Sequence, residues 1–222
     1  MRFPVLASDY DGTLAHDGRV DDATLRAVDR LRASGRRFVL VTGRELPDLL
    51  EIFPGVNRCD RVVAENGALL YRPTTNEQKV LGPPPDPGFV KALKTRGVRP
   101  LAVGQVIVAT CEPQYAAVLD IIHALALELQ VIFNKGSVMV LPSGVNKATG
   151  LAAALEELGV AAKDAVAVGD AENDHAFLAA CGRGAAVANA LPALRERAHV
   201  VTHGAEGAGV AELIDRILDD AL

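Results

Sequence analysis

The chain has 222 residues, half of them apolar and 23% charged, which predicts a folded protein with a buried core rather than a disordered one. The formal net charge of −5 argues against a nucleic-acid-binding protein, because contacts to a phosphate backbone require a basic face. The three cysteines lie far apart and form no CxxC pair, which favours a reducing, cytoplasmic setting over a disulfide framework or a zinc site. The apolar run Phe3–Ala7 is too short for a signal peptide, and no stretch is long enough to predict a membrane-spanning helix.

Short apolar runs that are typical of buried strands alternate with helical patterns near both ends of the chain. The first group comprises the strand Phe3–Ser8, a helix that begins at Asp21 or Asp22 and ends at Gly35, and the strands Phe38–Val41, Arg61–Ala64 and Ala68–Tyr71. The second group comprises the helix Lys147–Leu158, the strand Ala165–Val168, the helix Glu172–Ala180, the strand Ala185–Ala188, a short helix after Pro192, the strand His199–Val201 and the helix Gly209–Leu218. Continuous apolar strands between helices indicate a doubly wound, mainly parallel, Rossmann-like α/β sheet with helices on both faces.

The middle of the chain has a different pattern, which begins with a proline-rich segment at residues 83–88. After it the sequence predicts the helix Phe89–Arg96, the strand Gln105–Thr110, the helix Gln114–Leu127 and the strands Leu129–Phe133 and Ser137–Leu141, joined by a hairpin turn at Asn134-Lys135-Gly136. We therefore expect a sheet domain of residues 1–71 and 144–222, and a small inserted α+β domain of residues 72–143.

Polar motifs follow the apolar strands at what should be one edge of the sheet, where ligands of open α/β sheets bind. The first is Asp9-Tyr10-Asp11-Gly12-Thr13, in which both carboxylates leave the sheet in the same direction, since residues two apart in an extended chain point the same way. A divalent cation or a shared proton would relieve their repulsion. Alone, the motif is better explained as a polar turn.

The second motif, Thr42-Gly43-Arg44, offers a hydroxyl and a glycine amide that can hold an anion, although a helix cap would use the same residues. In the third, Lys147 begins a helix, where its charge opposes the macrodipole; a phosphate would explain this placement, and simple solvation of the lysine is the alternative.

The fourth motif places Asp170, Asn173 and Asp174 on one face of a helix N-terminus. Oxygen ligands without His or Cys suit Mg²⁺ rather than Zn²⁺, while an acidic helix cap is the simpler alternative. Taken together, the four motifs supply a nucleophile, a second carboxylate, a hydroxyl, a lysine and metal ligands, which is the inventory of phosphoryl transfer.

In this order, Asp9/Asp11, Thr42, Lys147 and Asp170/Asn173/Asp174 resemble the four motifs of the haloacid dehalogenase (HAD) superfamily of phosphatases. The insertion lies between Thr42 and Lys147 and is preceded by Glu65-Asn66-Gly67-Ala68, which is similar to the Cof-like branch. That branch includes sucrose-phosphate, mannosyl-3-phosphoglycerate and archaeal phosphoglycolate phosphatases. The resemblance covers the whole chain and implies a HAD-like core with a small cap domain.

The resemblance also implies roles for individual residues. Asp9 would be the nucleophile that becomes an aspartyl phosphate, and Asp11 the general acid and then the general base. Mg²⁺ would be bound by Asp9, the main-chain carbonyl of Asp11, Asp170 and Asp174. The phosphoryl group would be held by Thr42, Gly43, Arg44, Asn66, Lys147 and Asn173.

The sequence therefore predicts a Mg²⁺-dependent phosphatase for a small phosphorylated metabolite, such as a sugar phosphate or a phosphorylated hydroxy acid. Two alternatives are a phosphomutase of the same superfamily and a non-enzymatic phosphoacceptor domain that resembles response-regulator receivers, which lack the insert and the fourth motif. We expect the insert to act as a lid that selects the substrate, with Lys135 as its first candidate contact. The sequence gives no indication of the oligomeric state.

Overall fold

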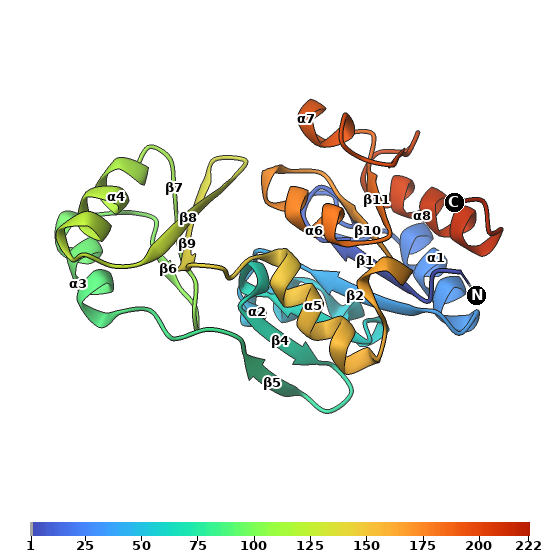
Figure 1. The fold of residues 1–222 in the computed structure, drawn as a ribbon, viewed down its shortest axis with the longest axis horizontal. Helices are drawn as coiled ribbons and strands as arrows, with labels where there is room; N and C mark the ends of the chain where they lie inside the picture. The colour runs from blue at the N-terminus through green and yellow to red at the C-terminus, as the bar shows by residue number, and fades with distance from the viewer. Residues whose placement is uncertain (1) are drawn as a thin grey trace.

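The computed structural model describes residues 2–222 and contains two sheets (Figure 1). The larger sheet has eight strands in the order β12-β11-β10-β1-β2-β3-β4-β5. Its parallel strands are β1 (Val5–Asp9), β2 (Arg37–Val41), β3 (Arg61–Ala64), β10 (Ala165–Gly169), β11 (Arg183–Ala186) and β12 (Val200–Val201). Two antiparallel strands complete it, β4 (Leu69–Arg72) and β5 (Glu77–Val80). The predicted mainly parallel α/β sheet is confirmed.

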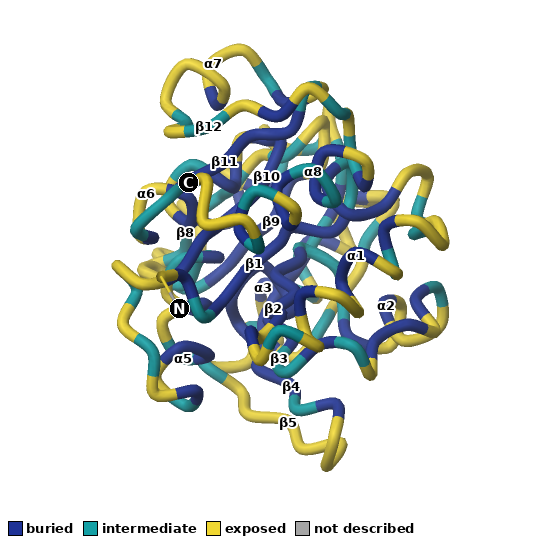
Figure 2. Tube along the Cα trace, turned by 90° about the vertical axis from the view of Figure 1, so that its right-hand side faces the viewer, coloured by how far each residue is buried: buried dark blue, intermediate teal, exposed yellow. Residues whose placement is uncertain are grey.

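Helices cover both faces of this sheet, whose buried strands run through the middle of the molecule (Figure 2). The helices α1 (Asp22–Ala33) and α8 (Glu206–Leu218) pack together on one face, and α5 (Lys147–Leu158) and α6 (His175–Ala180) pack on the other. All five residues of β1 are buried, as expected for a central strand covered on both sides. None of the helices within residues 2–222 is both long and apolar enough to cross a bilayer.

Short elements account for most of the differences from the predicted pattern. The helix α2 (Leu46–Ile52) was not predicted, because it is only seven residues long and carries a proline in its first turn. The predicted helix from residue 172 is divided into a 3₁₀ turn and α6. The remaining short elements are α7 (Pro192–Arg195) and the 3₁₀ turns η1 (Pro54–Arg58), η2 (Glu65–Gly67), η3 (Ala162–Asp164) and η4 (Glu172–Asp174).

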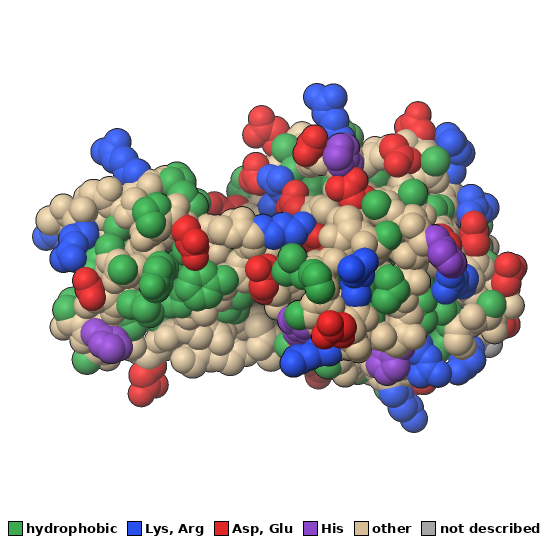
Figure 3. All heavy atoms as spheres, turned by 90° about the horizontal axis from the view of Figure 1, so that it is seen from above, with side chains coloured by type: hydrophobic (Ala, Val, Ile, Leu, Met, Phe, Trp, Pro, Cys, Tyr) green, Lys and Arg blue, Asp and Glu red, His purple; other side chains and the backbone are tan. Residues whose placement is uncertain are grey.

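The smaller sheet is antiparallel and has the order β6-β7-β9-β8. It consists of β6 (Ala102–Val103), β7 (Val108–Cys111), β8 (Leu129–Asn134) and β9 (Ser137–Pro142), and its helices are α3 (Pro87–Arg96) and α4 (Tyr115–Ala124). Successive residues of β9 face opposite sides, so Val140 packs with α3 and α4 while Met139 and Leu141 join a second apolar cluster with Ala68 of the larger domain. From above, the smaller domain forms the left-hand lobe, on which hydrophobic side chains gather (Figure 3).

The chain leaves the larger sheet later than the sequence indicated. Strand β5 pairs with β4, so residues 77–80 belong to the larger sheet, whereas we expected the insert to begin at residue 72. All four residues of β5 are exposed. A strand with no buried face needs no alternation of apolar and polar residues, so the sequence gives no strand pattern there. Backbone pairing with β4, which no sequence pattern reveals, holds it in place.

A hairpin turn brings the tip of the smaller domain toward the larger one. Asn134 and Ser137 pair across the strands β8 and β9, which leaves Lys135 and Gly136 as the two residues of the turn. Their φ angles are 46° and 84°, the left-handed conformation that a tight two-residue hairpin requires. The predicted turn is confirmed, and its geometry makes Lys135 the outermost side chain of the hairpin.

The carboxylate of Glu65 fixes the approach of the smaller domain. It accepts hydrogen bonds from the backbone N–H groups of Gln105 at 2.9 Å, Val106 at 2.8 Å and Ile107 at 3.0 Å. Glu65 is buried and has a φ of 51°, so a strained backbone aims its side chain across the junction. One carboxylate from the end of β3 therefore ties the two domains together.

We expect Glu65→Ala to lower the free energy of unfolding by at least about 2 kcal/mol, because backbone N–H groups at the junction lose their acceptor. Urea denaturation measures the change. Glu51→Ala, at an exposed position of α2, is the matched control and should change stability by less than about 0.5 kcal/mol. If Glu65→Ala cost no more than the control, the proposed tie between the domains would be wrong.

Candidate active site

The central strands of the larger sheet bring the first and fourth motifs together. Asp9 is the last residue of β1, and Ser8 is level with Val168 of β10, so Asp9 and Asp170 leave the sheet side by side. Carboxylate oxygens of Asp9, Asp170 and Asp174 all lie within 4.8 Å of one another, and all three residues are buried. Three acidic groups from distant parts of the sequence thus share one small volume.

Lys147 supplies the positive charge at the centre of this cluster. Its ammonium donates to Asp9 Oδ1 at 2.5 Å and to Asp174 Oδ1 at 2.6 Å, and its side chain is only 1% exposed. The side chain of Asn146 caps α5 by accepting from the backbone N–H groups of Ala148 and Thr149, which fixes Lys147 in the first helical turn. Gly67 allows this approach, because a Cβ there would collide with the carbonyl of Asn146.

Burial and charge shift the proton affinities of this cluster. Burial raises the pKa of Asp9 well above its usual range, and the carboxylates of Asp174 and Asp170 add to the effect, whereas Lys147 opposes it. Burial alone would lower the pKa of Lys147, but the Asp174 and Asp9 carboxylates raise it above its ordinary value. The cluster therefore keeps the ammonium of Lys147 charged.

Asp174 acts on its neighbours through both oxygens. Its Oδ2 accepts from the backbone N–H groups of Asp170 at 2.8 Å and Ala171 at 3.0 Å, while Oδ1 accepts from Lys147. Each carboxylate oxygen accepts about two hydrogen bonds, so Asp174 has little capacity left for a direct bond to a metal ion. Its geometry suits a residue that shapes the loop and contacts a metal through water.

Asp170 is held by two side chains. Its Oδ1 accepts from the hydroxyl of Thr13 at 3.0 Å, and its Oδ2 accepts from the ammonium of Lys135. Burial raises the pKa of Asp170, although Lys135 and Thr13 oppose the shift. Thr13 was not among the predicted site residues, and its place four residues after Asp9 gives no signal without the fold.

The guanidinium of Arg44 pairs with Asp11 and does not line a free anion site. Its guanidinium donates to both oxygens of Asp11 at 2.8 Å and to Asp48 Oδ2 at 2.6 Å. The sequence assigned Arg44 to phosphate binding; the structure instead shows its side chain paired with these two carboxylates. Asp11 is therefore oriented by a bidentate ion pair.

A second group of polar residues lies beside the carboxylates. The Asn173 side chain donates to Asn66 Oδ1 at 2.9 Å, and the backbone N–H of Asn66 donates to the carbonyl of Thr42. Within residues 2–222, the buried atoms Asn66 Nδ2 and Asn173 Oδ1 find no hydrogen-bond partner. A Cβ built on Gly43 would lie 4.0 Å from Asn173 Nδ2, so the Thr42–Gly43 segment reaches the same place. An unpaired buried amide donor next to a glycine backbone suits a phosphoryl oxygen.

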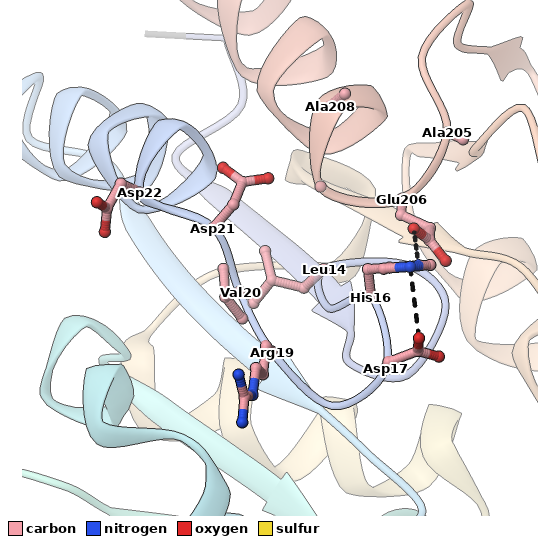
Figure 4. A pocket seen from close by; sticks show the side chains of 11 residues that line it. Leu14, His16, Asp17, Arg19, Val20, Asp21, Asp22, Ala205, Glu206 and Ala208 are labelled. Atoms are coloured by element: carbon pink, nitrogen blue, oxygen red, sulfur yellow. Dashed lines mark ion pairs between the residues drawn. The ribbon is translucent and has the colours of Figure 1, made fainter.

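A separate hollow of about 970 Å³ lies outside this cluster, between the loop that follows Thr13 and the start of α8 (Figure 4). His16 points toward Glu206 and Asp17 there, and its ring lies 2.7 Å from the Glu206 carboxylate. The contact with Glu206 raises the pKa of His16. No predicted site residue lines this hollow, which is separate from the buried carboxylate cluster.

Comparisons with known proteins agree with this geometry. The sequence model of the haloacid dehalogenase-like hydrolases matches residues 6–82 and 104–214. Phosphoglycolate phosphatase 2 of Saccharolobus solfataricus is 30% identical over 220 residues, covering 96% of this chain and 92% of that protein. Phosphoglycolate phosphatase of Methanothermobacter thermautotrophicus is 31% identical over 226 residues, covering 96% and 98%.

Solved structures show the same fold at lower sequence identity. A haloacid dehalogenase-like hydrolase from Bacteroides thetaiotaomicron has a TM-score of 0.83 at 19% identity, covering 97% of this chain and 99% of that one. A HAD/Cof-like hydrolase from Plasmodium vivax has a TM-score of 0.83 at 18% identity, covering 98% and 96%. The predicted Cof-like resemblance is confirmed, and the chain belongs to the haloacid dehalogenase-like hydrolase family.

Proposed function

We propose that this protein is a Mg²⁺-dependent phosphatase that hydrolyses a small phosphorylated metabolite through an aspartyl-phosphate intermediate. The observation that carries the proposal is the setting of Asp9 at the end of the central strand. Only its Oδ1 accepts a hydrogen bond from a side chain within residues 2–222, so Oδ2 is available for attack. Lys147 and the carboxylates of Asp170 and Asp174 lie around it.

The residues around Asp9 fit the metal that this chemistry needs. All the donors are oxygens, and Asp9 and Asp170 have the geometry to bind a cation directly, with Asp174 acting through water. The main-chain carbonyl of Asp11 is the remaining predicted ligand. When bound, Mg²⁺ would neutralise charge on the phosphoryl group and on Asp9.

Residues of the chain then bind the phosphoryl group, attack it and transfer the proton. The phosphoryl oxygens are held by the Thr42 hydroxyl, the Gly43 backbone N–H, Lys147, and the amides of Asn66 and Asn173. Asp9 Oδ2 forms a bond to phosphorus as the bond to the leaving oxygen breaks. Asp11, once released from Arg44 and protonated by solvent water, gives this proton to that oxygen and afterwards takes a proton from the water that hydrolyses the aspartyl phosphate.

The relatives indicate which substrate to test first. Two archaeal phosphoglycolate phosphatases align with this chain over nearly its whole length. The expected insert, residues 72–143, carries seven Lys or Arg against five Asp or Glu, whereas the rest of the chain is acidic, and this favours an anionic substrate. We therefore propose 2-phosphoglycolate, or a close relative among phosphorylated hydroxy acids, as the substrate.

We expect Asp9→Asn to lower kcat for phosphate release from 2-phosphoglycolate by at least about 10³-fold, because the nucleophilic oxygen is lost. The variant should still fold, since burial already disfavours the charged form of Asp9. Asp164→Asn, at an exposed position, is the matched control. Mass spectrometry must exclude deamidation, after which activity above a few per cent of wild type would refute the nucleophile assignment. A single phosphorylation of wild type without turnover would instead favour the phosphoacceptor alternative.

We expect Asp170→Asn to weaken Mg²⁺ binding by more than about 10-fold, and Thr13→Val to weaken it by less, because Thr13 only orients the ligand oxygen. Isothermal titration calorimetry with Mg²⁺ alone measures both changes without relying on activity. The exposed Asp164→Asn variant again serves as the control. Equal affinities for wild type and Asp170→Asn would show that the metal binds elsewhere.

A further inference from the structure

Lys135 reaches the carboxylate cluster from the smaller domain. It lies at the tip of the β8–β9 hairpin, and its ammonium donates to Asp170 Oδ2. Its backbone N–H lies 3.3 Å from the Glu172 carboxylate, so the turn itself also touches the loop after β10. Asp170 is fully buried, whereas the Lys135 side chain is 45% exposed. The contact thus joins a fixed carboxylate to a side chain that is free to move.

Gly12 makes room for this ammonium. A Cβ at Gly12 would lie 2.5 Å from Lys135 Nζ and 2.7 Å from Asp170 Oδ2, and its φ of 80° suits glycine. The loop after the nucleophile strand, the loop after β10 and the hairpin tip therefore meet at one point. Burial alone would lower the pKa of Lys135, but Asp170, Asp9 and Asp174 raise it, so the ammonium stays charged.

A metal ion bound to Asp170 would lie close to the Lys135 ammonium. Oδ1 of Asp170 is occupied by Thr13, and Oδ2 by Lys135. A divalent cation that binds Asp170 competes with the ammonium at close range. Because Lys135 has a long flexible stem and is half-exposed, it can leave Asp170 without unpacking the core.

The sheet that carries the hairpin also presents apolar side chains at the junction with the larger domain. Met139 projects from β9 toward the phosphate-binding segment, and its sulfur would lie 3.3 Å from a Cβ on Gly43. Ile107 and Leu141 belong to the same buried cluster. Lys135, on the same hairpin as Met139, therefore presents a cation next to the carboxylate cluster that contains Asp9.

We propose that Lys135 binds a carboxylate on the leaving group of the substrate after a divalent cation has replaced it on Asp170. This inference rests on the proposed phosphatase function and assigns a residue to its preference for phosphomonoesters of short hydroxy acids. It makes Lys135 a specificity residue and not a participant in bond making or breaking.

The first test compares two substrates of similar size, 2-phosphoglycolate and ethyl phosphate, which lacks the carboxylate. In Lys135→Met, the ratio of their kcat/KM values should fall about 10- to 100-fold relative to wild type, mainly through KM for 2-phosphoglycolate, since one charge-assisted hydrogen bond is lost. Lys135→Arg should recover part of the ratio. Lys94→Met, on the exposed side of α3, is the matched control and should leave the ratio unchanged.

The second test measures binding of Mg²⁺ alone by calorimetry. Lys135→Met should bind Mg²⁺ about 3- to 10-fold more tightly than wild type, because a tethered competing cation has been removed. An unchanged affinity would overturn the proposed exchange on Asp170. A substrate ratio within two-fold of wild type, or a parallel fall for both substrates, would overturn the proposed recognition of the carboxylate. Wild-type protein that hydrolyses neither substrate nor any other phosphomonoester would refute the proposed function itself, before any variant is compared.

Discussion

The buried ammonium of Lys147 is the interaction on which the rest of the active site depends. It lies between Asp9 and Asp174, which come from distant parts of the sequence, and it is almost completely shielded from water. Moving such charges out of water costs several kcal/mol for each ion, and replacing similar ion clusters by apolar residues is often neutral or stabilising. The apolar layers around β1 and β10 must offset this cost. A cluster that contributes so little to stability is best understood through the chemistry it permits.

The order of the strands explains why this cluster can form. Strand β1 lies between β10 and β2. The next strands in the sequence are added on one side of β1, and the last strands are added on its other side. The ends of neighbouring strands at such a reversal are the usual ligand site of open α/β sheets. The inserted domain leaves the larger sheet after β5 and returns directly before Lys147. Its connection is therefore placed so that the insert overhangs the site without interrupting the central strands.

The sequence predicted the parts of the site that obey this rule of strand ends. Asp9, Thr42 and Asp170 each follow a run of apolar residues, and Lys147 begins a helix. Because the apolar runs form parallel strands, these residues lie at the same edge of the sheet. The sequence could not predict that Arg44 pairs with Asp11. Each residue had a reasonable role alone, and whether the two form an ion pair depends on side-chain geometry. Glu65 was also missed, since its partners are backbone N–H groups some forty residues away and leave no pattern in the sequence. Contacts of this kind are specified by the folded backbone and not by local periodicity.

The hairpin that carries Lys135 has a mechanical consequence. Strand β9 has six residues between the tip and the return to the larger domain, a length of roughly 20 Å at about 3.3 Å per residue. The tie through Glu65 lies near the other end, close to the chain crossings. A rotation of the smaller domain about the domain junction would therefore displace the hairpin tip much more than the junction. A rotation of about 10° at the junction moves the tip by roughly 3–4 Å over that length, which is enough to separate an ammonium from a carboxylate while the junction itself hardly changes.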